Sequence, residues 1–71
     1  MKIRVLIIED EKLSTEKLIR TLLSIDPEID VSATSRSVEE SIEILENESF
    51  DLIFSDIQLT DGLSFSIFQK I

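Results

Sequence analysis

The sequence predicts a single α/β domain built on a parallel sheet, because short apolar runs alternate with amphipathic segments along the chain. Three runs are predicted as strands, at residues 3–8, 29–35 and 50–55, and each is followed by a stretch with helical spacing. Strands separated in this way pair in parallel through right-handed crossovers. At 71 residues the chain can hold one domain at most, with a small core.

The first strand and helix open the chain. Residues 3–8 (IRVLII) are almost continuously apolar and β-branched, which is typical of a strand buried on both faces. From Leu13 the apolar residues recur at helical spacing between charged side chains. We expect this helix to end near Ser24 or Ile25, because the position before Pro27 disfavours helical geometry.

The second strand and helix follow the proline. Residues 29–35 (IDVSATS) alternate between apolar and polar, as in a half-exposed or edge strand. Ser37 and Glu40 match the capping box, in which each side chain satisfies a free backbone donor at a helix start. The strand is expected to place Ile29, Val31 and Ala33 on one face, and the helix to bury Val38, Ile42 and Leu45.

The third strand is predicted at residues 50–55 (FDLIFS), a short apolar run that ends at Asp56 and indicates a buried strand. Asp61-Gly62 marks a turn. Helical spacing then resumes and continues to the last residue. The apolar positions of this third helix are Leu63, Ile67, Phe68 and Ile71.

The composition restricts the function classes. The chain has no cysteine and no histidine, which excludes disulfides and zinc sites built from those residues. Its formal charge of −8, from 15 acidic and 7 basic side chains, repels nucleic-acid backbones and anionic membranes, so we expect neither as a partner of this segment. The apolar run at residues 5–8 is too short for a signal peptide or a membrane span. A cytoplasmic location is therefore expected.

Carboxylates follow two of the predicted strands. Glu9 and Asp10 come after the first strand, and Asp56 comes after the third. Ligands of open parallel sheets bind beyond the carboxyl ends of the strands, so the three groups would converge if these strands are neighbours. Such a cluster either raises a pKa or holds a cation such as Mg²⁺, which would favour phosphoryl transfer to a carboxylate. From the residues alone, acids that merely solvate a loop or start a helix remain an equal alternative.

Two segments resemble the signatures of bacterial response-regulator receiver domains, namely VLIIEDE at residues 5–11 and DLIFSDIQLTDGLSF at residues 51–65. The resemblance covers essentially the whole chain. It implies a flavodoxin-like, doubly wound parallel sheet of order 2-1-3 and a phosphoryl group accepted on Asp56 from a sensor histidine kinase. By position it also implies the ligands of a Mg²⁺ ion. These are Asp56 and Asp10 directly, Glu9 through water and Gln58 through its backbone carbonyl.

The sequence departs from the receiver pattern in two respects. Thr60 stands where the family usually has proline, which removes no catalytic group. The family's Ser/Thr after the fourth strand and Lys after the fifth would lie beyond Ile71, so residues 1–71 are interpreted as an incomplete receiver domain. Residues 61–65 resemble regulators of the LytTR type, which implies a DNA-binding output domain downstream.

Two other functions compete with this interpretation. Residues 56–60 come within one residue of the Asp-x-Asp-x-Thr motif of haloacid-dehalogenase-like phosphohydrolases, but Gln58 stands in place of the general acid. Alternatively, the segment is only an assembly element, because a sheet that ends at its third strand exposes an apolar edge. We accordingly expect a dimer, with exchanged elements as one form. Beyond Mg²⁺-dependent self-phosphorylation and autodephosphorylation, no enzymatic activity is expected.

Overall fold

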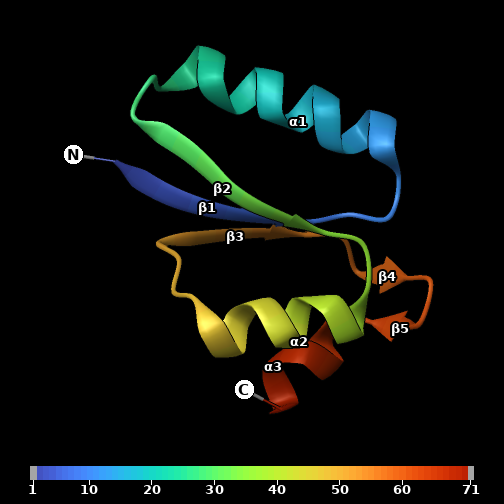
Figure 1. Ribbon diagram of the computed structural model, residues 1–71. Coiled ribbons are helices and arrows are strands. Elements are labelled where there is room, and N and C mark those ends of the chain that lie inside the picture. Colours follow the sequence, from blue (N-terminus) through green and yellow to red (C-terminus); the bar gives the residue numbers. More distant parts are fainter. Residues whose placement is uncertain (1, 71) are drawn as a thin grey trace.

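The computed structural model describes residues 2–70 and contains a three-stranded parallel sheet with helices on both faces (Figure 1). The strands are β1 (Ile3–Ile8), β2 (Ile29–Ser35) and β3 (Leu52–Ser55), in the order β2-β1-β3. Helix α1 (Lys12–Ile25) covers one face, and α2 (Val38–Asn47) and α3 (Phe65–Lys70) cover the other. A hairpin of β4 (Gln58–Leu59) and β5 (Gly62–Leu63) precedes α3. The predicted flavodoxin-like topology of order 2-1-3 is thus confirmed.

The central strand β1 carries most of the core. Val5, Leu6, Ile7 and Ile8 are each 0% exposed. Val5 and Ile7 pack toward α1, whereas Leu6 and Ile8 pack toward α2 and α3, because successive side chains of a strand point to opposite faces. Burial on both faces explains why this strand is apolar at consecutive positions.

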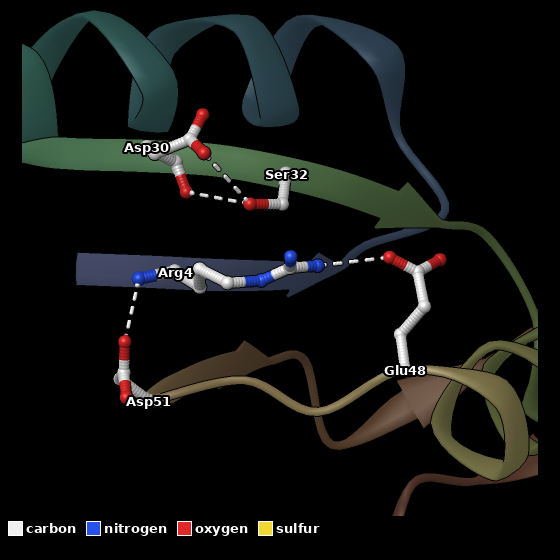
Figure 2. A network of polar contacts seen from close by, with 5 residues as sticks. All are labelled: Arg4, Asp30, Ser32, Glu48 and Asp51. Atoms are coloured by element: carbon white, nitrogen blue, oxygen red, sulfur yellow. Dashed lines mark hydrogen bonds and ion pairs between the residues drawn. The ribbon is translucent and has the colours of Figure 1, made fainter. Parts of the chain in front are cut away.

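Strand β2 contains a bulge at Ser32. Val5 of β1 pairs with Val31, but the next residue, Leu6, pairs with Ala33. The extra residue reverses the alternation, so Val31 packs on the α1 side and Ala33 on the α2 side. The expectation that Ile29, Val31 and Ala33 share one face is therefore wrong. The Ser32 hydroxyl donates a hydrogen bond of 3.0 Å to Oδ2 of Asp30 (Figure 2).

Helix α2 begins at the predicted N-cap residue, Ser37. The Ser37 hydroxyl accepts a hydrogen bond of 3.1 Å from the Glu40 N–H. The Glu40 carboxylate in turn accepts one of 2.9 Å from the N–H of Arg36, one residue before the N-cap. The serine half of the Ser-x-x-Glu prediction is thus confirmed, whereas the glutamate satisfies the N–H of Arg36 and not the N-cap N–H of Ser37.

Arg4 ties β1 to the segment between α2 and β3 (Figure 2). Its guanidinium lies 2.9 Å from the Glu48 carboxylate and 5.3 Å from the centre of the Phe50 ring. Its backbone N–H donates to the Asp51 carboxylate at 2.8 Å, and the Asp51 N–H donates to the Arg4 carbonyl at 2.8 Å. These contacts set the start of β3 beside β1.

Strand β3 and helix α3 differ from the sequence prediction. Within residues 2–70, β3 pairs with β1 alone, which leaves Leu52 47% and Ile53 37% exposed. The prediction of a buried third strand is wrong for that reason. The third helix starts at Phe65 because Leu63 pairs with Gln58 in the hairpin, and Ile71 lies outside the described residues. No helix in the described part of the chain is long and apolar enough to span a membrane.

Candidate metal centre

Three carboxylates meet at the carboxyl end of the sheet. Glu9 and Asp10 follow β1, and Asp56 follows β3, which is the parallel neighbour of β1. Ile8 pairs with Ser55, so the loop after β1 and the loop after β3 begin side by side. One carboxylate oxygen from each of the three acids lies within 4.8 Å of the other two. The structure therefore brings together the acids that the sequence analysis selected.

Backbone hydrogen bonds extend the sheet into this site. The Asp56 N–H donates to the Ile8 carbonyl at 2.9 Å, and the Glu9 N–H donates to the Ser35 carbonyl at 2.9 Å. The Asp56 carboxylate accepts a hydrogen bond of 2.9 Å from the Ile57 N–H, which orients it. The backbones of Glu9 and Asp56 are therefore held to the end of the sheet.

The three acids differ in burial and repel one another. Glu9 and Asp10 are half-buried, and Asp56 is exposed. Burial raises the pKa of the Glu9 carboxyl, and the side chains of Asp10 and Asp56 raise it further, against hydrogen bonds from the Glu11 and Asp10 backbone. Repulsion of this kind is relieved by a bound cation. Oxygen ligands alone suit a hard divalent ion such as Mg²⁺.

A crevice of about 240 Å³ opens beside the acids. Its walls are apolar side chains of β1, α1 and β3, and its rim carries Glu9, Ser55 and Asp56. The crevice lies on the α1 side of the sheet, where Leu18 and Phe54 line it. A reacting group can therefore approach Asp56 from solvent.

The sequence predicts the turn of the hairpin after Asp56 but not its two short strands. Gln58 pairs with Leu63, and Leu59 pairs with Gly62, whose φ of 148° suits a residue without a side chain. The Leu59 side chain is buried in the core under α2. The structure thus places Gln58 two residues after Asp56 at the start of β4, and its role as a carbonyl ligand stays a prediction.

Asp61 joins this hairpin to α2. Its Oδ1 accepts a hydrogen bond of 2.7 Å from the Val38 N–H, and its Oδ2 accepts one of 3.1 Å from the Glu39 N–H. These two bonds hold the pKa of the Asp61 carboxyl below its usual value. The sequence indicates a turn at Asp61 but not its bonds to α2, because nothing local shows that it reaches a helix more than twenty residues earlier.

The sheet order, the crossovers and the acids at the ends of β1 and β3 define a receiver-type α/β domain. No protein-family model matches the chain. Curated relatives do: the sensory transduction proteins LytR of Staphylococcus epidermidis (38% identical over 96% of this chain) and LytT of Enterococcus faecalis (39% over 94%). A protein-glutamate methylesterase/protein-glutamine glutaminase of Carboxydothermus hydrogenoformans is 43% identical over 89% of the chain.

The similarity of nearly the whole chain to part of LytR and LytT supports a receiver-domain fragment of a response regulator. The chain spans 27% of the length of LytR and LytT and 18% of the methylesterase. A solved structure, an aspartate-to-alanine mutant of the response regulator MaeR bound to sulfate, superposes with a TM-score of 0.85 and 21% identity. The match covers 99% of this chain and 57% of that one and supports the fold.

Proposed function

We propose that this chain is the phosphoacceptor part of a response regulator, which accepts a phosphoryl group from a sensor histidine kinase on Asp56 in the presence of Mg²⁺. The observation that carries the proposal is the convergence of the Glu9, Asp10 and Asp56 oxygens within 4.8 Å. A sensory transduction protein and a protein-glutamate methylesterase/protein-glutamine glutaminase share this segment, which favours a common input function for it.

The donor set fits Mg²⁺, which takes one or two carboxylates and completes its octahedron with carbonyl, water and phosphate oxygens. Asp10 and Asp56 would hold the ion directly, Glu9 through water, and Gln58 through its backbone carbonyl. When bound, the ion neutralises charge on the transferring phosphoryl group. The carboxylate oxygens of Glu9 and Asp10 lie within 4.8 Å of that of the reacting Asp56, which keeps their charges close to it.

Asp56 is the nucleophile in this proposal. A carboxylate oxygen of Asp56 forms a bond to phosphorus while the phosphorus–nitrogen bond of the kinase phosphohistidine breaks. The leaving ring nitrogen keeps the electron pair of that bond, and the histidine departs as neutral imidazole because its other ring nitrogen already carries a proton. The Ile57 N–H, 2.9 Å from Asp56 Oδ1, holds the carboxylate in one orientation during the attack. The product is an acyl phosphate, and its hydrolysis restores the carboxylate.

Intact mass measurement tests the proposal. The chain is incubated with Mg²⁺ and a small acyl-phosphate donor, and we expect one added phosphoryl group. Asp56→Asn should remove the adduct. Asp51→Asn is the matched control, because Asp51 lies before the other end of β3, where it bonds to Arg4, and should leave the adduct intact. Absence of an adduct at every Mg²⁺ concentration, both in the unaltered chain and in a longer protein that contains it, would refute the proposal.

The remaining assignments follow from the same proposal. The segment has no turnover beyond self-phosphorylation and hydrolysis of its own acyl phosphate, and it works in the cytoplasm, where a sensor kinase presents its phosphohistidine. Its net charge of −8 argues against nucleic-acid contact, so DNA binding would belong to an output domain elsewhere in the protein. No observation favours the phosphohydrolase alternative, since an amide, Gln58, occupies the position of the general acid.

A further inference from the structure

We infer that Asp61 is a positioning residue for the metal centre: by bonding to the start of α2 it fixes the hairpin that follows Asp56. The inference rests on the proposed function, because it concerns the same Mg²⁺ and phosphoryl site. Asp61 touches neither the ion nor the phosphoryl group in this account. It acts through the backbone between itself and Asp56.

The tether consists of two hydrogen bonds from a single carboxylate. Asp61 Oδ1 lies 2.7 Å from the Val38 nitrogen and Oδ2 lies 3.1 Å from the Glu39 nitrogen. These N–H groups belong to the first turn of α2 and have no acceptor within the helix. Bonds from N–H to a charged carboxylate are the stronger class, and the helix N-terminus favours a negative charge. Because both oxygens are used, the hairpin is held in orientation as well as in position.

The hairpin is short, so a tether at its tip constrains all of it. Thr60 and Asp61 form the two-residue connection between β4 and β5. Below the tip, the Ser64 N–H donates to the Ile57 carbonyl at 2.8 Å, which closes the segment on the residue next to Asp56. A methyl group added at Gly62 would lie 3.7 Å from Val38, which shows how closely the hairpin backbone approaches α2.

The sheet holds the Asp56 backbone on its N-terminal side, where the Asp56 N–H donates to the Ile8 carbonyl at 2.9 Å. The backbone on its other side, which includes the Gln58 carbonyl, depends on the hairpin and hence on Asp61. Groups that orient metal ligands typically contribute about tenfold to a hundredfold to metal affinity. An effect transmitted through backbone should lie at the lower end of that range.

The first measurement is a calorimetric Mg²⁺ titration of the 71-residue chain and three variants. Asp61→Ala should raise the Kd about tenfold, and Asp61→Asn by less, because an amide keeps one acceptor oxygen. The matched control is Ser37→Ala. It removes the 3.1 Å bond to the Glu40 N–H at the same helix end without altering any hairpin contact, and should leave Kd within about twofold.

The second measurement needs no metal. Amide hydrogen exchange at Ser64, recorded in chelator and compared with Leu6 in the buried strand β1, reports local opening of the hairpin. Asp61→Ala should speed exchange at Ser64 but not at Leu6. Ser37→Ala should leave the ratio of the two rates unchanged.

Four outcomes overturn the inference. Unchanged Ser64 exchange in Asp61→Ala would show that the tether does not order the hairpin. Equal losses of Mg²⁺ affinity in Asp61→Ala and Ser37→Ala would show that weakening α2 is sufficient. If the unaltered chain does not bind Mg²⁺ at all, the proposed function fails first, and the metal part of the inference fails with it. An unaltered chain that binds Mg²⁺ and an Asp61→Ala variant that binds equally well would refute the inference alone.

Discussion

The hydroxyl groups of Ser35 and Ser41 lie 2.7 Å apart, and both side chains are buried where β2 meets α2. Each hydroxyl also lies within hydrogen-bond distance of the Ser37 carbonyl, at 3.1 Å for Ser35 and 2.7 Å for Ser41. The two serine hydroxyls and the Ser37 carbonyl form a triangle of three possible hydrogen bonds. The two hydroxyl protons can make two of these bonds at once, so neither donor is left without an acceptor. The triangle fixes the turn that carries β2 into α2.

Removal of one corner of this triangle should destabilise the fold. Ser41→Ala is expected to lower the free energy of unfolding by about 1 kcal/mol, the net contribution of a typical hydrogen bond. Ser14→Ala provides the control, because Ser14 is an exposed residue of α1, and its change should stay within about 0.5 kcal/mol. Urea titrations with linear extrapolation measure both. Equal effects would show that the buried hydroxyl contributes nothing specific.

The elements that sequence predicts well are those whose pattern is local. Strand β1 was predictable because burial on both faces requires an apolar run, and the start of α2 because the Ser37–Glu40 N-cap bond spans four residues. Predicting the convergence of Glu9, Asp10 and Asp56 required one further assumption, that β1 and β3 are neighbours. The sheet order confirms this assumption.

The features that were missed depend on contacts between distant residues. The bulge at Ser32 is set by the register of β2 on β1, which alternation alone cannot reveal. The Asp61 bonds join residues 22 and 23 positions apart. The exposure of Ile53 depends on what lies beside β3, and an apolar run has the same sequence whether one or both of its edges are covered. Such features require the tertiary arrangement.

The contact between Arg4 and Glu48 should contribute little, because the two side chains are 45% and 46% exposed. We expect Glu48→Gln to cost about 0.5 kcal/mol in low salt and less in about 1 M salt, where charges are screened. Arg4→Ala should cost more, since it also removes the stacking on Phe50. A double-mutant cycle with urea titrations at two salt concentrations separates the ion pair. A coupling energy that does not fall with salt would contradict this assignment.

Asp61 should make stability depend on acid pH. Its pKa is lowered in the folded chain by the N–H groups of Val38 and Glu39. A lowered pKa contributes stability that is present above the unfolded value, near 3.8, and is lost as the pH falls through the lower folded value. Asp61→Asn should therefore flatten the stability profile between about pH 5 and about pH 2 relative to the unaltered chain. Parallel profiles from thermal unfolding at each pH would exclude this contribution.

Magnesium and the charge cluster should affect stability in opposite directions. Without metal, Asp56→Asn should stabilise the chain at neutral pH, because it removes a carboxylate that repels Glu9. With free Mg²⁺ at about 100 times Kd, the unaltered chain should gain about 2.7 kcal/mol, whereas Asp10→Asn should gain much less. Thermal unfolding in chelator and in Mg²⁺ measures both effects. The same Mg²⁺ gain in Asp10→Asn would argue against Asp10 as a ligand.

The outer edge of β3 should promote self-association of the chain. Within residues 2–70 this edge has no hydrogen-bonded neighbour, and Leu52 and Ile53 are exposed on it. An unpaired apolar edge recruits another strand, and a charged side chain on the edge opposes this. Ile53→Lys should therefore shift the chain toward monomer in light scattering at micromolar concentrations.

Leu13→Lys is the control for that experiment, because Leu13 is an apolar residue that is even more exposed than Ile53 (71% against 37%) but lies on α1 and not on the sheet edge. If nonspecific contact between exposed apolar side chains causes association, both lysine variants should reduce it alike. If strand pairing causes it, only Ile53→Lys should do so, since that position alone places a charge beside the free backbone groups of β3. A monomeric unaltered chain with cooperative unfolding would contradict the expected dimer and show that the edge is stable without a partner.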